Sequence, residues 1–233
     1  MDGKTSGPSA RAFARRAGQV TLIAMSVLLA SLLLLVGIML LWSPGRAKPF
    51  LDDRGKLLSG SISEKIRVNI NGVEQGMFIK SRDARNPVLL YLHGGMPDYF
   101  LTQDYPTRLD EYFSVVWWEQ RGSGLSYSAN IPPESVNPEQ LVSDTVEVTN
   151  YLLKRFGQEK VYLMGHSGGT FIGIQAAARA PELYHAYIGV AQMSNQLDSE
   201  KLAYDYMLQR FKEDGNAKMV RKLEEAPVGD AIP

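Results

Sequence analysis

Runs of apolar residues along this chain predict one long helix, followed by short strands and helices that alternate. Residues 20–42 contain no charged side chain and are rich in Leu, Val, Ile and Met over 23 positions. At about 1.5 Å per residue, a helix of this length covers a hydrocarbon layer of roughly 30 Å. Trp42 suits a membrane interface, and Ser43-Pro44-Gly45 is expected to end the helix. We therefore expect residues 20–42 to cross a lipid bilayer once.

The residues on either side of this run bear on its orientation. Residues 1–19 form a short, basic tail that we expect to be cytoplasmic, and the basic residues after the run are accompanied by Asp52 and Asp53. This balance favours a single-pass membrane protein with its main domain outside the cytoplasm. The alternative is a cleaved signal peptide, but the apolar stretch of such a peptide is about 7 to 15 residues long, and an Ala-x-Ala cleavage site is not evident here.

After a linker at residues 43–60, the pattern changes to that of an α/β domain, which we place at 61–197. Two β-type runs flank Asn71-Gly72, a strong hairpin signal, and are expected to form an antiparallel edge. Continuous apolar runs further on are typical of parallel strands buried on both faces. The expected strands cover residues 62–70, 73–79, 87–92, 113–118, 161–164 and 186–193.

Helical patterns lie between these strands. Asn137-Pro138 provides a cap and an N1 proline for a helix that should end at Gly157. Further helical patterns cover residues 102–112, 171–180 and 199–225, and we expect 198–233 to begin a helical lid. The alternation predicts an α/β fold with a doubly wound, mostly parallel sheet, preceded by one transmembrane helix.

Composition excludes several classes of function. The chain of 233 residues is 45% apolar and 21% charged, which is ordinary for one globular domain. Its formal net charge is zero and it has no long basic run, so we expect no nucleic-acid partner. The absence of cysteine excludes disulfides and thiolate chemistry. His93, His166 and His185 are the only histidines and lack metal-ligand spacing, so no metal and no cofactor are expected.

The candidate chemistry centres on Gly165-His166-Ser167-Gly168-Gly169, a G-x-S-x-G motif between an apolar run and a helical pattern. In this context the motif predicts a nucleophile elbow that holds Ser167 on a strained turn. Gly165 and Gly169 let strand and helix pass closely, and Gly168 offers a backbone N–H to an oxyanion. A small-residue turn with a solvated serine is the alternative interpretation of the motif alone.

Two further loops are expected at the same edge of the sheet. His93-Gly94-Gly95 follows a buried strand, and a backbone N–H between Gly94 and Met96, with Gly95 and Met96 as the candidates, should complete the oxyanion hole with Gly168. We expect His93 to be a structural hydrogen-bonding residue. The loop at 120–124 lacks a phosphate-binding motif, so we expect it to pack beside the elbow with Arg121 in a structural ion pair.

The sequence resembles α/β-hydrolases of the proline iminopeptidase type, from about residue 62 to residue 191. The resemblance rests on three signatures: residues 92–95 (LHGG), 118–126 (WEQRGSGLS) and 165–169 (GHSGG). It departs from the family at Met96-Pro97, at Glu119 where the family has Asp, and at Gly168 where the aminopeptidases often carry an aromatic residue. It implies attack by Ser167 on an ester, amide or peptide carbonyl, through an acyl-enzyme. The substrate is expected to be a small molecule or a short peptide.

The resemblance also implies an acid and a histidine after the serine in the chain, and neither is identifiable. His185 is the only later histidine and precedes a strand, whereas the side chain of His166 should diverge from Ser167 and shape the site. The later acids Asp198, Glu200, Asp205 and Asp214 lie in the expected lid. We therefore expect a membrane-anchored serine hydrolase whose C-terminal part is absent. The alternatives are a non-catalytic binding protein with the same fold, or an inactive truncated product.

Overall fold

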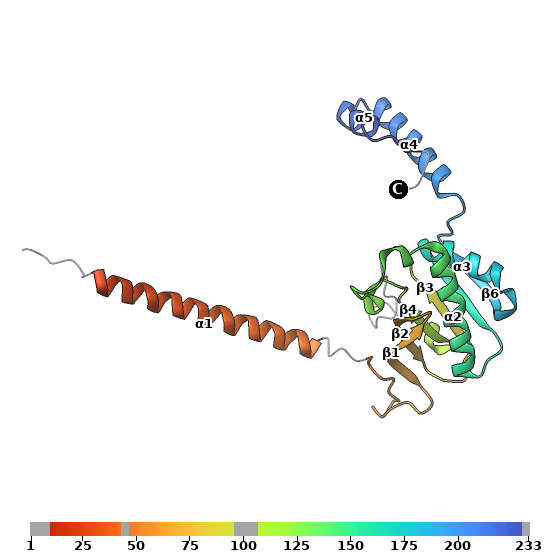
Figure 1. The fold of residues 1–233 in the computed structure, drawn as a ribbon, viewed down its shortest axis with the longest axis horizontal. Helices are drawn as coiled ribbons and strands as arrows, with labels where there is room; N and C mark the ends of the chain where they lie inside the picture. The colour runs from red at the N-terminus through yellow and green to blue at the C-terminus, as the bar shows by residue number, and fades with distance from the viewer. Residues whose placement is uncertain (1–9, 43–46, 96–106, 230–233) are drawn as a thin grey trace, which may run out of the picture. The chain divides into compact units, whose positions relative to one another are not determined.

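The chain divides into two units, Met1–Ala47 and Lys48–Pro233, in a computed structural model that describes residues 10–42, 47–95 and 107–229. The described part of the first unit is dominated by helix α1 (Ala10–Trp42) (Figure 1). Its segment Arg15–Trp42 is long and apolar enough to cross a membrane. The helix ends at Trp42 as expected but begins at Ala10, so it includes ten residues of the expected tail. Alanine and arginine are strong helix formers, which accounts for this extension.

The second unit is built on a six-stranded sheet with the strand order β1-β2-β4-β3-β5-β6. Neighbouring strands from β4 to β6 run parallel, whereas β1 pairs with β2 and β2 pairs with β4 in antiparallel fashion. The doubly wound, mostly parallel sheet is therefore confirmed. The strands are β1 (Ile62–Ile70), β2 (Val73–Ser81), β3 (Val88–Leu92), β4 (Ser114–Trp118), β5 (Val161–His166) and β6 (Tyr184–Val190).

The hairpin forms where the sequence predicts it. Ile70 pairs with Val73, and Asn71 and Gly72 both have positive φ, of 47° and 78°. Two consecutive residues with positive φ make the type of two-residue turn that matches the twist of the flanking strands. This turn places β1 at one edge of the sheet.

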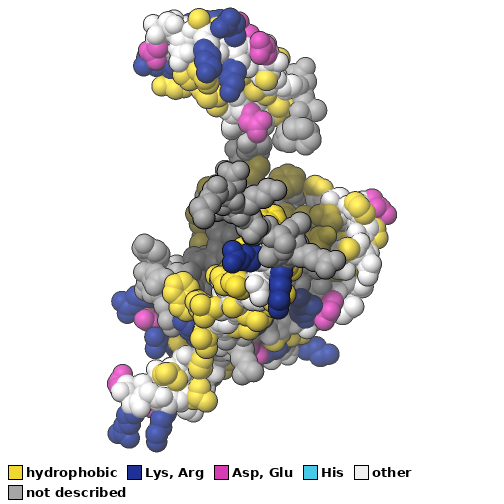
Figure 2. Space-filling model, turned by 90° about the vertical axis from the view of Figure 1, so that its left-hand side faces the viewer, with side chains coloured by type: hydrophobic (Ala, Val, Ile, Leu, Met, Phe, Trp, Pro, Cys, Tyr) yellow, Lys and Arg dark blue, Asp and Glu magenta, His cyan; other side chains and the backbone are white. Residues whose placement is uncertain are grey.

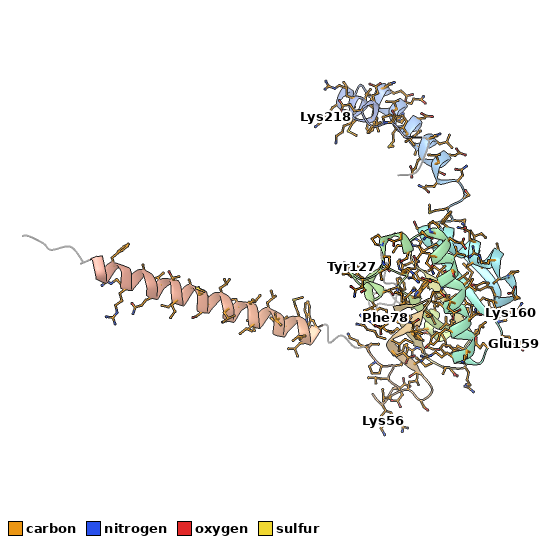
Figure 3. The ribbon with its side chains drawn as sticks, viewed as in Figure 1. Lys56, Phe78, Tyr127, Glu159, Lys160 and Lys218 are labelled. Atoms are coloured by element: carbon orange, nitrogen blue, oxygen red, sulfur yellow. The ribbon has the colours of Figure 1, made fainter. Side chains whose placement is uncertain are left out.

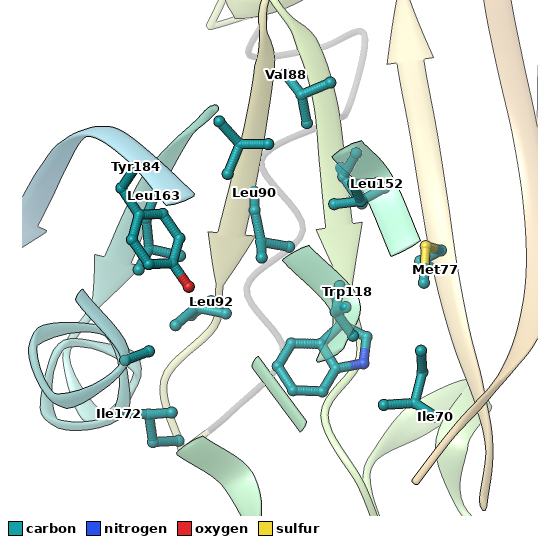
Figure 4. Close-up of a cluster of buried hydrophobic side chains, with 14 of the residues drawn as sticks. Ile70, Met77, Val88, Leu90, Leu92, Trp118, Leu152, Leu163, Ile172 and Tyr184 are labelled. Atoms are coloured by element: carbon teal, nitrogen blue, oxygen red, sulfur yellow. The ribbon is translucent and has the colours of Figure 1, made fainter. Parts of the chain in front are cut away.

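The core lies on the central strands, where every residue of β3 and β4 is buried. Leu90, Leu92, Leu163 and Trp118 meet there with Leu152 of helix α2 (Pro138–Phe156) (Figure 4). Such unbroken apolar runs are stable only where both faces of a strand are covered. This core fixes the carboxyl ends of β3, β4 and β5 at one edge of the sheet.

Helices α2 (Pro138–Phe156) and α3 (Gly168–Arg179) pack against each other in the same unit. The side chain of Asn137 accepts a hydrogen bond from the Gln140 amide, and Gly157, with φ of 63°, ends α2 as expected. Short 3-10 helices occupy connecting segments: η1 (Leu109–Glu111), η2 (Gly124–Ser126), η3 (Pro133–Ser135) and η4 (Pro181–Leu183).

Besides α1, the larger differences from the sequence expectation concern three segments. Strand β6 is shifted toward the N-terminus, at Tyr184–Val190. The last helical pattern is two helices, α4 (Gln196–Glu213) and α5 (Ala217–Glu224), which separate near Gly215, where φ is 66°. In the expected helix at 102–112, the described residues contain only η1, and the rest of that helix lies outside the described residues.

Candidate active site

Ser167 occupies the turn between β5 and α3, with φ of 50° and ψ of −120°. A residue with a Cβ atom rarely adopts this conformation, which costs on the order of 1 to 3 kcal/mol. The surrounding backbone holds it there, because the Ser167 amide donates to the Val190 carbonyl at 2.9 Å and the Thr170 amide donates to the Ser167 carbonyl at 2.9 Å. The strained strand-turn-helix geometry that the motif predicts is present.

Close backbone packing explains the glycines of the motif. A Cβ atom on Gly169 would lie 2.2 Å from the Leu92 carbonyl oxygen and 2.7 Å from that of His93. A Cβ atom on Gly165 would lie 2.7 Å from the Gly169 carbonyl oxygen. The start of α3 therefore lies directly against the end of β3, and only glycine fits at these two positions.

Replacing Gly169 by alanine is expected to destabilise the domain by about 3 kcal/mol, the upper end of the usual cost of overpacking, because both obstacles are backbone atoms. Urea unfolding of the two proteins measures the difference. Gly95→Ala is the matched control, since a Cβ atom there would meet nothing within 4 Å. Equal unfolding midpoints for Gly169→Ala and the wild type would contradict the close packing.

The loop after β3 lies beside the serine. A Cβ atom on Gly94 would lie 3.0 Å from the Ser167 Cβ and 3.5 Å from its Oγ, and a Cβ atom on Gly168 would lie 3.6 Å from the Gly95 nitrogen. The structure thus brings Gly94, Gly95, Ser167 and Gly168 together, as expected for this edge of the sheet. Met96, the other candidate for the oxyanion hole, lies outside the described residues.

His93 is buried and joins two loops through hydrogen bonds. The Gln120 amide donates to its Nε2 at 3.3 Å, so Nε2 is the acceptor, and Nδ1 donates to the Gly94 carbonyl at 2.7 Å. Nε2 also lies 3.1 Å from Ser123 Oγ, and the Gln120 side chain donates to the His93 carbonyl at 3.0 Å. Both ring nitrogens are occupied by the loops.

The loop after β4 closes on Glu119, which is the first residue beyond the strand and is buried. Its carboxylate accepts a hydrogen bond from the Leu125 amide, and its carbonyl accepts one from the Ser126 hydroxyl. A Cβ atom on Gly124 would lie 1.9 Å from Glu119 Oε2. The longer side chain at this position is therefore accommodated by a glycine five residues later.

Arg121 forms the structural ion pair that the sequence predicts, and its partner is Asp144 of α2. Arg121 Nε lies 2.7 Å from Asp144 Oδ2, and the two side chains are 4% and 0% exposed. The amides of Asn71, Gln75 and Gln140 also donate to the Asp144 carboxylate, each at 2.8 Å. Burial opposes ionisation, but these hydrogen bonds outweigh it and lower the pKa of Asp144. The network ties the loop after β4 to α2 and to the hairpin.

The structure places His185 away from the serine. His185 lies near the amino end of β6, with its ring centroid 5.0 Å from that of Tyr162 in β5, whereas Ser167 follows the carboxyl end of β5. At about 3.3 Å per residue, roughly 15 Å separates the two ends. The later acids belong to α4 or its C-cap: Asp198, Glu200, Asp205 and Asp214.

His166 is the last residue of β5 and is half-buried. Among residues 10–42, 47–95 and 107–229, no imidazole or carboxylate hydrogen-bonds the Ser167 hydroxyl. Sequence reasoning missed Asp144, although a signal was available: this charged residue lies three positions after Leu141, on the same face of α2 as that apolar residue.

The sheet, the strained serine turn and the adjacent glycine loop define the α/β-hydrolase class. The family described as serine aminopeptidase, S33, matches residues 84–213, more than half of the chain. The chain belongs to this family of hydrolases.

Similarity to individual proteins is consistent with that class. The chain is 38% identical over 149 residues to the probable aminopeptidase YbaC of Bacillus subtilis, covering 63% of this chain and 47% of that protein. It is 26% identical over 137 residues to lipase member M of Mus musculus, covering 51% of this chain and 31% of the lipase. A solved proline iminopeptidase-related protein from Thermus thermophilus is similar at 26% identity and a TM-score of 0.48, covering 58% of this chain and 47% of that one. The chain spans at most about half the length of these relatives.

Proposed function

We propose that Ser167 is the nucleophile of a hydrolase that cleaves an ester, amide or peptide bond. Its Oγ attacks the carbonyl carbon, the leaving group departs with a proton, and water then releases the acyl group from Ser167. The observation that carries the proposal is the strained turn, which holds Ser167 against the backbone of Gly94 at the carboxyl edge of the sheet. Locating a fluorophosphonate adduct on Ser167 by peptide mass spectrometry tests it.

The oxyanion hole is proposed to consist of the Gly168 amide and an amide of Gly95 or Met96. The short distance between the Gly95 nitrogen and the position of a Gly168 Cβ atom, 3.6 Å, supports this pairing. Two backbone donors fixed by the elbow and by the loop after β3 stabilise the negative charge that develops on the carbonyl oxygen. His93, Gly94 and His166 shape the surroundings of these donors.

The reaction also requires a base, because a serine hydroxyl is a weak nucleophile near neutral pH. His93 does not suit this task, since its two nitrogens serve the loops. His185 does not suit it either, because it lies at the opposite end of β5. Neither His93 nor His185 is therefore proposed as the base.

An aminopeptidase-like substrate, a short peptide with a free amino terminus, is proposed as the first class to assay. The description of the family and the name of the Bacillus subtilis relative support it. Glu119 and Gly168 differ from the proline iminopeptidase pattern, so proline specificity is not part of the proposal.

The membrane role proposed for α1 is a single-pass anchor with the hydrolase domain outside the cytoplasm. A reporter enzyme that works only outside the cytoplasm is expected to be active when it is fused after Gly60, because the basic tail precedes the apolar helix. The Leu33→Arg/Leu34→Arg variant should abolish reporter translocation, since each arginine at a helix centre costs about 2.5 to 3.5 kcal/mol on insertion.

Two outcomes would contradict this topology. A reporter active only in the cytoplasm reverses the orientation. A mature protein that begins near residue 45 shows that the helix is a cleaved signal sequence, since such a sequence is also an apolar helical segment near the N-terminus.

A further inference from the structure

Residues 50–58 form a small closed loop at the start of the second unit, here called the 50–58 loop. The Leu58 amide donates to the Phe50 carbonyl at 2.9 Å, and the Asp52 amide donates to the Lys56 carbonyl at 2.7 Å. Figure 3 shows Lys56 at the outer end of this loop. The hydrogen bonds hold the loop in one shape, so its side chains form a defined surface.

The 50–58 loop exposes two leucines and two cations. Leu51 and Leu57 pair across the loop and are 52% and 71% exposed. Arg54 and Lys56 are exposed at its tip. The Asp52 carboxylate instead accepts hydrogen bonds from the Arg54 and Lys56 amides, at 2.9 and 2.8 Å, so it serves the loop itself.

More cations surround the base of the loop. The Phe50 ring lies near two of them, with Lys80 at 5.4 Å and Arg82 at 5.2 Å from its centroid. Burial lowers the pKa of Lys80, whereas the charge of Asp110 raises it. The charge of Lys48 lowers this pKa further, so Lys48 lies in the same electrostatic environment as Lys80. Lysine and arginine side chains gather with hydrophobic ones at this lower end of the domain (Figure 2).

Acidic groups compensate this charge only in part. Asp110 lies 4.0 Å from Arg82. Glu64 is paired with Arg155 of α2. Glu64 and Lys65 are successive residues of β1, so their side chains point to opposite faces of the sheet. The exposed Asp53 is the remaining acid within the 50–58 loop. The surface is therefore basic, with apolar side chains at its centre.

Chain length adds a second, independent argument. Only residues 43–47 lie between the end of α1 at Trp42 and Lys48. At no more than about 3.5 Å per residue, Lys48 cannot be farther than about 21 Å from the end of α1. If α1 spans a bilayer, the 50–58 loop is restricted to the neighbourhood of the lipid surface, on whichever side α1 ends.

We propose that the 50–58 loop, with Lys48, Lys80 and Arg82, docks on an anionic phospholipid surface. The four-carbon stems of lysine and the leucine side chains enter the headgroup region, and the cations bind lipid phosphates. Each cation near such a surface contributes about 1 kcal/mol, or about fivefold in the docking equilibrium. This surface is distinct from the Ser167 site, and its role does not depend on the proposed chemistry.

The test uses the full chain, in single copies in nanodiscs, with one cysteine introduced as Leu57→Cys. Because the chain has no native cysteine, an environment-sensitive dye labels this position alone. Quenching of the dye by acrylamide, which is uncharged, should fall several-fold when phosphatidylglycerol is added to phosphatidylcholine discs. The Arg54→Glu/Lys56→Glu variant should reduce docking by about 25-fold or more and restore the quenching, since two cations are lost.

Ala178→Cys is the matched control, because this exposed residue lies in α3 beside β5 and β6, at the other edge of the sheet from β1. Its quenching should not depend on the lipid. Equal quenching at Leu57→Cys in the two lipids, or protection that survives the double charge reversal, would overturn the proposal. Protection at Ala178→Cys would do so too. The same protection by inorganic phosphate in neutral discs would identify a site for a soluble anion instead.

Discussion

Replacing Ser167 by alanine is expected to reduce ester or peptide hydrolysis by the active enzyme by about a millionfold, since a nucleophile and its base act as a unit. The variant removes only Oγ and keeps the Cβ atom beside Gly94. Folding should therefore persist in this variant. Turnover should fall to the rate that the backbone donors and substrate binding alone maintain, about 10³ to 10⁴ times the rate of the uncatalysed reaction in water. Turnover and fluorophosphonate labelling are the two measurements.

Ser128→Ala is the control for this experiment, because Ser128 is an exposed serine on the loop after β4. It should leave both measurements unchanged. Labelling that survives in Ser167→Ala would exclude Ser167 as the nucleophile. If the wild type binds peptides but is never labelled, the domain is a binding protein with an inert serine.

Replacing Asp144 by alanine is expected to destabilise the domain by about 3 to 5 kcal/mol, because it leaves the buried Arg121 guanidinium without its counter-charge. The side-chain amides of Asn71, Gln75 and Gln140 also lose their acceptor. Such a loss is a large fraction of the roughly 5 to 15 kcal/mol that is usual for a folded domain. Urea unfolding measures the change.

Glu139→Ala is the matched control from the same helix. Glu139 pairs with Arg179 at 2.8 Å, but the two side chains are 76% and 40% exposed. An exposed pair contributes about 0 to 1 kcal/mol, so this variant should unfold almost as the wild type does. Similar losses for the two variants would show that the buried network is no more important than a surface pair.

The Asp144 network also predicts how stability depends on pH. Since the folded pKa of Asp144 is lower than its ordinary value of 3.8, its contribution is complete above that value. The contribution is lost as the pH falls below 3.8 toward the folded pKa, because the unfolded chain binds the proton more readily. Asp144→Asn should remove this part of the acid dependence. An unchanged slope of stability against pH would contradict the assignment.

Most of the fold was predictable because its signals are local. Asn71-Gly72 specifies a hairpin within a few residues, and the runs that became β3 and β4 specify strands buried on both faces. The order of the strands was not predictable in this way. It depends on pairings such as that of β2 with β4, between residues far apart in the chain. The early start of α1 depends on helix propensity, which apolar periodicity does not report.

In the candidate site too, features with a local sequence signal were predictable and contacts between distant residues were not. The strained turn at Ser167 follows from a five-residue motif and its strand-helix context. That Arg121 would be paired was predictable from its loop, but Asp144 as its partner was not, because 23 residues separate them. The role of Gly124, which makes room for the Glu119 carboxylate, depends on a contact that only the folded loop reveals.

The positive φ of Ser167 sets stability against activity at a single residue. Glycine adopts this conformation without strain, so a Ser167→Gly protein, which is expected to be inactive, is relieved of on the order of 1 to 3 kcal/mol of backbone strain. Laboratory evolution of this enzyme that rewards heat resistance alone would therefore favour loss of the nucleophile. A library screened for thermal stability has to be scored for catalysis in the same round, since the residue proposed as the nucleophile is also one that the surrounding backbone would hold more easily as glycine.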